Sequence, residues 1–125
     1  MGQRHTLLVV DDEDAVRGVL MRMLQVSGYA TTAAPNAAAA LACFEAGQRF
    51  DLVICDQRMP AMSGNECLQH IWTMVPDQRV LRVAGASQDA DEAAEALGRR
   101  TPVLIKPFTM ERLLEAVHDA IAAES

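Results

Sequence analysis

The sequence predicts an α/β fold in which helices cover both faces of a doubly wound, five-stranded parallel sheet. Short, β-rich apolar segments alternate with longer segments of helical periodicity along the whole chain. This alternation is typical of parallel strands joined by crossover helices. The length of 125 residues suits a single core. We therefore expect one domain spanning residues 1–125.

Five apolar segments bounded by turn residues are expected to form the strands. They are Thr6 to Val10, Tyr29 to Ala33, Phe50 to Cys55, Arg79 to Val83 and Val103 to Ile105. Right-handed crossovers between five strands in a chain of this size fit the flavodoxin-like strand order 2-1-3-4-5.

Five helices are expected between and after these strands. They are Val16 to Leu24, Asn36 to Ala46, Asn65 to Met74, Asp89 to Leu97 and Met110 to Ala123. Gly28, Pro76 and Gly98 follow three of them as stop signals, and Thr109 precedes the last as an N-cap.

The composition argues against several classes of protein. The formal net charge is −6 and the pI is near 4.9, which argues against a nucleic-acid-binding surface. No apolar run is long enough to span a membrane and no signal peptide is evident, so we expect a cytoplasmic protein. Cys43, Cys55 and Cys67 are widely spaced in apolar surroundings, and we expect reduced packing residues.

Charged side chains follow three of the predicted strands. Asp11 and Asp12 follow the first strand, Asp56 the third, and Lys106 the fifth. Taken singly, each residue fits an ordinary turn, helix cap or solvated loop. Because the carboxyl ends of parallel strands share one edge of the sheet, the four are expected to converge there. Grouped carboxylates suit Mg²⁺.

Three segments then resemble the signatures of a known family. VVDDED, LVICDQRMPAMSG and VLIKPF occur in this order and are similar to those of the CheY-like receiver domain of two-component response regulators. The resemblance covers essentially the whole chain, and Met59-Pro60 and Gly64 match the loop that follows the acceptor aspartate. It implies that residues 1–125 form one receiver domain.

The resemblance also implies a function. Asp56 would accept a phosphoryl group from a phosphohistidine on a sensor histidine kinase or a histidine phosphotransfer protein. Asp11, Asp12, Asp56 and the backbone carbonyl of Arg58 would hold Mg²⁺. Lys106 would pair with the phosphoryl oxygens, and the Lys106-Pro107 peptide bond would be cis. Such a domain catalyses its own phosphorylation and dephosphorylation and is not otherwise an enzyme.

Two positions depart from the family pattern. Ala84 stands where the family usually has Ser or Thr, and Val103 stands at the usual aromatic position of the fifth strand. Alanine has no hydrogen-bond donor, so the usual hydroxyl switch is missing. Three explanations stay open: a phosphate contact from Ser87, closure of the backbone amides of Gly85 and Ala86 on the phosphate, or a relay with little conformational response.

The sequence also bears on phosphodonor docking and on self-association. By the resemblance, a phosphodonor would dock on residues of the first helix and of the loop after strand five, namely Ala15, Val16, Val19, Pro107 and Phe108. Ordinary core packing is the alternative for the three helix residues. The predicted fourth helix, DADEAAEAL, lacks bulky anchors, so we expect a monomer or a weak dimer.

Parts of the sequence are compatible with two other functions. The segment from Asp12 to Val16 also fits the DxDx[TV] pattern of haloacid-dehalogenase-like phosphatases, but that reading leaves Asp56 unexplained. A pseudo-receiver that acts as an interaction module without phosphorylation is the second alternative, although both the acceptor Asp and the Lys are present. Glu13 and Asp14 are expected in the first turn of helix one, where negative charge suits the helix dipole.

Overall fold

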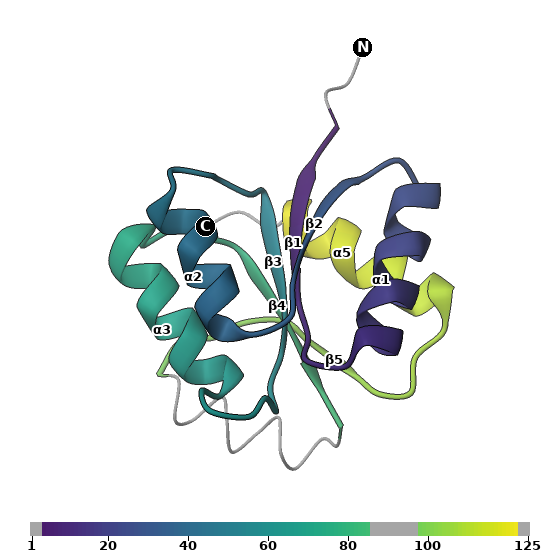
Figure 1. Cartoon of the computed structure of the whole chain (residues 1–125). Helices are drawn as coiled ribbons and strands as arrows, with labels where there is room; N and C mark the ends of the chain where they lie inside the picture. Colours follow the sequence, from purple (N-terminus) through teal and green to yellow (C-terminus); the bar gives the residue numbers. More distant parts are fainter. Residues whose placement is uncertain (1–3, 86–97, 123–125) are drawn as a thin grey trace.

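A five-stranded parallel sheet lies between two layers of helices in the computed structural model, which describes residues 4–85 and 98–122 (Figure 1). The strands are β1 (Thr6–Val10), β2 (Ala30–Ala34), β3 (Leu52–Asp56), β4 (Val80–Ala84) and β5 (Val103–Ile105). Their order is β2-β1-β3-β4-β5, and every neighbouring pair is parallel. The predicted α/β fold and strand order are confirmed.

The limits of three strands differ from the prediction. β1 and β5 have the predicted bounds, whereas β2, β3 and β4 end one residue later. Apolar runs mark the buried part of a strand, but the ladder between strands decides where it ends. Asp56 is consequently the last residue of β3 and is paired with Val83, and Ala84 is paired with Ile105. The backbone of Asp56 is thereby held within the sheet.

The described helices are α1 (Asp14–Val26), α2 (Ala37–Glu45), α3 (Gly64–Met74) and α5 (Met110–Ala122). Thr109 caps α5 as predicted, since its Oγ1 accepts a hydrogen bond from the backbone N of Arg112 at 3.1 Å. Gly28, with φ of 97°, follows the end of α1. Glu13 is the N-cap of α1 and precedes its first turn, which corrects its predicted place. The helix predicted from Asp89 to Leu97 lies outside the described residues.

Two hydrophobic clusters fill the space on either side of the sheet. Leu8, Val53 and their neighbours pack against α2 and α3, and Leu7, Ile54 and their neighbours pack against α1 and α5. Successive residues of a strand point to opposite faces, which explains the alternation. Figure 1 shows the same division, with α2 and α3 on the left and α1 and α5 on the right.

All three cysteines are free thiols in this arrangement. Cys55 on β3 and Cys67 on α3 are buried in the cluster beneath α2 and α3, and Cys43 is half-buried. The sequence-based expectation of packing residues agrees with these positions. Within residues 4–85 and 98–122, no helix combines the length and the apolar character needed to cross a membrane.

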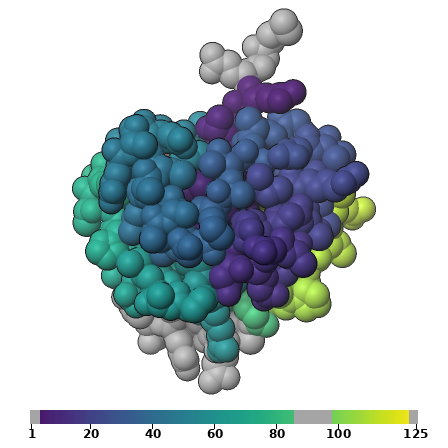
Figure 2. Space-filling model, in the orientation of Figure 1, coloured from purple at the N-terminus to yellow at the C-terminus, as the bar shows by residue number. Residues whose placement is uncertain are grey.

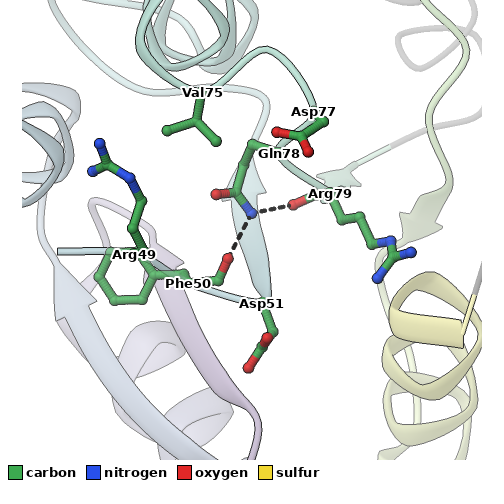
Figure 3. Close-up of a pocket in the computed structure, with 7 residues that line it drawn as sticks. All are labelled: Arg49, Phe50, Asp51, Val75, Asp77, Gln78 and Arg79. Atoms are coloured by element: carbon green, nitrogen blue, oxygen red, sulfur yellow. Dashed lines mark hydrogen bonds between the residues drawn. The ribbon is translucent and has the colours of Figure 1, made fainter. Parts of the chain in front are cut away.

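The amino ends of β3 and β4 are tied together by Gln78 (Figure 3). Its Nε2 donates hydrogen bonds to the carbonyl oxygens of Phe50, at 3.1 Å, and Arg79, at 2.9 Å. Gln78 lines a hollow of about 310 Å³ together with Arg49 and Asp77. Because it lies at the amino ends of the strands, the hollow is remote from the acidic residues at their carboxyl ends.

Candidate functional site

Three carboxylates converge at the carboxyl edge of the sheet, the lower edge in Figure 1. Asp11 and Asp12 follow β1, and Asp56 ends β3. One carboxylate oxygen of each lies within 4.8 Å of those of the other two. Asp11 and Asp56 are buried, with exposed fractions of 1% and 6%, whereas Asp12 is exposed. Two carboxylates of the cluster are therefore held in the interior, and the third lies at the surface.

The hydrogen bonds of Asp11 leave one of its oxygens available. Its Oδ1 accepts a hydrogen bond from the backbone N of Glu13 at 2.9 Å, and Nη1 of Arg17 donates to its backbone carbonyl at 2.8 Å. Its Oδ2 is buried and has no hydrogen-bond partner in the part of the chain that the structure describes. A buried carboxylate oxygen without a partner is unfavourable. The residues therefore fit a small divalent cation that takes oxygen ligands, such as Mg²⁺.

Lys106 brings a positive charge to this cluster. Its Nζ lies 3.5 Å from Oδ2 of Asp56, and its side chain is partly exposed. The backbone N of Lys106 donates to the carbonyl of Ala84 at 2.8 Å, and its peptide bond to Pro107 is cis. The other oxygen of Asp56, Oδ1, accepts a hydrogen bond from the backbone N of Arg58 at 3.4 Å.

Burial governs the electrostatics of the two inner carboxylates. It raises the pKa of Asp11 and of Asp56 above the ordinary value of 3.8. The charge of Lys106 opposes the increase in pKa of both groups, and the charge of Asp11 adds to the increase for Asp56. Holding these carboxylates ionised side by side is therefore unfavourable unless another positive charge is added.

A family model for the response regulator receiver domain matches residues 7–118. The chain belongs to this family. Receiver domains accept a phosphoryl group from histidine kinases, and they are not a conventional enzyme family. The acidic cluster of Asp11, Asp12 and Asp56 is typical of the magnesium-binding site of a receiver domain.

Curated relatives of this receiver domain are longer proteins. The sensor kinase CckA of Brucella abortus is 33% identical over 117 residues, which are 93% of this chain and 12% of that protein. The transcriptional regulatory protein ZraR of Klebsiella oxytoca is 36% identical over 122 residues, which are 97% of this chain and 27% of that protein. The chain thus spans less than a third of the length of these two relatives.

Solved receiver domains have the same fold. The chemotaxis protein CheY4 of Vibrio cholerae matches with a TM-score of 0.84 at 29% identity, covering 94% of this chain and 99% of that one. The structure described as FixJ-N matches with a TM-score of 0.83 at 30% identity, covering 99% of this chain and 98% of that one. These similarities agree with the CheY-like strand order of the sheet.

The remaining predicted site residues of the receiver domain lie around the cluster. Ala84 is buried at the end of β4, Gly85 after it is exposed, and Val103 is half-buried at the start of β5. Arg58 is exposed on the loop after β3. Ala86 and Ser87 lie outside the described residues. The functional roles of these positions stay predictions.

Sequence reasoning did not identify two residues that shape the site. Arg17 binds the carbonyl of Asp11, and Arg82 lies buried in β4 next to the loop that follows Asp56. Gly64 was singled out from the sequence, and the structure adds that it packs against the backbone of Asp56. For Arg82 a signal was available, because an arginine in the middle of the apolar strand VLRVA is unusual. The contact of Arg17 depends on tertiary packing and leaves no comparable signal.

Proposed function

We propose that residues 1–125 form one phosphoacceptor receiver domain in which Asp56 takes a phosphoryl group from a phosphohistidine. The observation that carries this proposal is the pairing of Asp56 with Lys106, 3.5 Å apart, beside two further carboxylates. The donor would be a sensor histidine kinase or a histidine phosphotransfer protein. A carboxylate is a suitable nucleophile for phosphorus, and its position at the open edge of the sheet allows a donor to approach.

The transfer exchanges one bond to phosphorus for another. A carboxylate oxygen of Asp56 attacks the phosphorus atom, the P–O bond of an acyl phosphate forms, and the P–N bond to the imidazole breaks. The imidazole nitrogen keeps the electron pair of that bond and is protonated as it leaves. Lys106 pairs with the phosphoryl oxygens as a compact positive charge, which favours the approach of a negatively charged group to an acidic site.

Asp11, Asp12 and Asp56 would hold Mg²⁺, with the backbone carbonyl of Arg58 as a fourth protein ligand. When bound, the ion supplies positive charge that offsets the negative charge developing on the transferred oxygens. The unpartnered Oδ2 of Asp11 supports this assignment, since the cation would satisfy it. Ala84 has no hydroxyl to donate to the phosphoryl group. The backbone amides of Gly85 and Ala86 would donate to it instead.

An apolar hollow next to Lys106 is the proposed docking surface for the phosphodonor. It has a volume of about 410 Å³ and includes residues of α1 and of the loop before α5: Ala15, Val16, Val19, Pro107 and Phe108. Val19 is 53% exposed although it is apolar. In Figure 2 the first turn of α1, in dark purple, lies at the surface near the yellow-green segment that begins α5.

Phosphorylation with small donors tests the chemistry directly. The protein is incubated with Mg²⁺ and either acetyl phosphate or phosphoramidate, whose P–N bond resembles that of phosphohistidine, and the intact mass is measured. We expect a phosphoryl adduct that is abolished by Asp56→Asn and retained by Asp14→Asn, since Asp14 is an exposed residue of α1 outside the cluster. A wild-type protein without an adduct would contradict the proposal and favour a pseudo-receiver.

The docking surface is tested separately from the chemistry. Val19→Glu places a charge in the apolar hollow without touching the carboxylates. We expect this variant to react normally with phosphoramidate and to accept phosphoryl groups more slowly from a phosphorylated histidine phosphotransfer protein. Equal slowing with both donors would show that the substitution acts on the site itself.

A further inference from the structure

Arg82, the middle residue of β4, is a charged side chain buried inside the sheet region. Its exposed fraction is 3%, and its four companions in the strand are apolar. Arginine is almost never buried unless its guanidinium is hydrogen-bonded, because removing the charge from water is costly. Burial lowers the pKa of Arg82, but a guanidinium keeps its proton in proteins. A permanent positive charge is therefore present within the fold.

This charge lies between the two positions where the family pattern is broken. Arg82 is the register partner of Val103 on β5 and of Cys55 on β3. Paired residues of neighbouring parallel strands point to the same face of the sheet, and so does the residue two positions further along a strand. Ala84 and Val103 are thus the neighbours of Arg82 along its own strand and across to β5. Both are small aliphatic residues.

The hydrogen bonds of Arg82 join the acceptor loop to the beginning of β5. Its Nε donates to Oγ1 of Thr101 at 2.6 Å, and its Nη1 donates to Oε1 of Gln57 at 3.3 Å. Gln57 directly follows Asp56, and its backbone N donates to the carbonyl of Val83 at 2.9 Å. A single guanidinium therefore contacts both the residue after the acceptor and the residue two positions before β5.

Phosphorylation would change the charge next to the acceptor loop that this guanidinium contacts. With Mg²⁺ bound, the three carboxylates are balanced by a divalent cation and the ammonium group of Lys106. A phosphoryl group on Asp56 raises the negative charge at that position to about −2. Arg82 is linked to the acceptor loop through its hydrogen bond to Gln57, the residue that follows Asp56, and little water screens a buried charge. The side chain of Arg82 is thus placed to respond to the added charge.

We propose that Arg82 is the switch residue of this receiver domain and takes over the role that a hydroxyl at position 84 and an aromatic ring at position 103 would have. This switch depends on the proposed phosphorylation of Asp56. The added negative charge draws the guanidinium toward the acceptor loop and strengthens its contact with Gln57. Its hydrogen bond to Thr101 weakens, and the start of β5 changes its environment.

Nuclear magnetic resonance of the ¹⁵N-labelled full chain tests this switch. Backbone amide shifts of Thr101 and Val103 are compared before and after adding Mg²⁺ and beryllofluoride, which forms an adduct with a carboxylate that resembles an acyl phosphate. We expect clear shifts in the wild type and roughly half of that change or less in Arg82→Met. Arg79→Met, which removes an exposed arginine just before β4, should respond as the wild type does.

Two further measurements separate the possible outcomes. Thr101→Val removes the acceptor for Nε while keeping the side-chain shape, so it should also suppress the response of Val103, and it decides the matter if Arg82→Met does not fold. Both variants should still form the acetyl phosphate adduct. A full-sized Val103 response in either folded variant would overturn the switch, whereas a wild type without any adduct would overturn the proposed function instead.

Discussion

Gly64, the first residue of α3, packs directly against the backbone of Asp56. A Cβ atom at position 64 would overlap the carbonyl oxygen of Asp56 and lie 2.9 Å from the Cα atom of Gln57. The backbone N of Gly64 also donates to the carbonyl of Gln57 at 3.1 Å. Helix α3 and the end of β3 therefore meet at a point where no side chain fits.

Gly64→Ala should destabilise the protein by about 1–3 kcal/mol, because the backbone of Asp56 must move to make room for the methyl group. The same movement should slow phosphorylation by acetyl phosphate. Gly18→Ala is the matched control, since position 18 lies in α1 with no atom near its Cβ. It should stabilise the protein by about 0.5–1 kcal/mol. Urea denaturation measures both values, and equal effects of the two substitutions would contradict the prediction.

The metal-free protein should become less stable as the pH rises above about 4 and through the raised pKa values of Asp11 and Asp56. The pKa values of Asp11 and Asp56 are raised in the folded state, so the folded protein binds more protons than the unfolded chain in this range. The free energy of unfolding therefore falls with rising pH. Thermal unfolding in EDTA measures the slope, and Asp56→Asn should flatten it. An identical slope in the variant would assign the pH dependence to other groups.

Magnesium should stabilise the folded protein at neutral pH by about 1.4 kcal/mol at a concentration ten times its dissociation constant. Asp12→Asn should weaken binding about tenfold or more, because it removes one charged ligand oxygen from the cluster. Asp14→Asn changes a neighbouring acid that pairs with Arg17 outside the cluster, and it should leave the affinity almost unchanged. Isothermal titration calorimetry measures the affinities, and similar losses in both variants would indicate a general charge effect.

The three thiols should react with iodoacetamide at different rates. Cys43 is half-buried, whereas Cys55 and Cys67 are buried. The hydrogen bond with Cys67 and then burial raise the pKa of Cys55 well above 9.0, which keeps it as an unreactive thiol. Mass spectrometry of the native protein should find Cys43 modified about tenfold faster or more than Cys55. In urea the rates should become similar, and a Cys55 that reacts as fast as Cys43 in the native protein would contradict the assigned packing.

Local pattern and strand-end chemistry were sufficient to predict most of the site. Apolar segments bounded by turn residues located all five strands, and acids after the first and third strands predicted a cluster that the fold does assemble. This works because the carboxyl ends of parallel strands must share one edge. The strand limits could not be predicted as closely, because they follow from pairing between strands. Asp56 was expected after the third strand, but it is the last residue of β3 and pairs with Val83.

The sequence by itself determined the order of elements, the edge at which Asp11, Asp12, Asp56 and Lys106 meet, and the missing hydroxyl at Ala84. Tertiary structure alone decided that Asp11 keeps an unpartnered oxygen and that Gly64 lies against Asp56. It also decided that Arg82 reaches both Gln57 and Thr101. The reason is physical: residue type and spacing fix which edge or face a side chain occupies, whereas its contacts depend on how distant strands and helices are aligned.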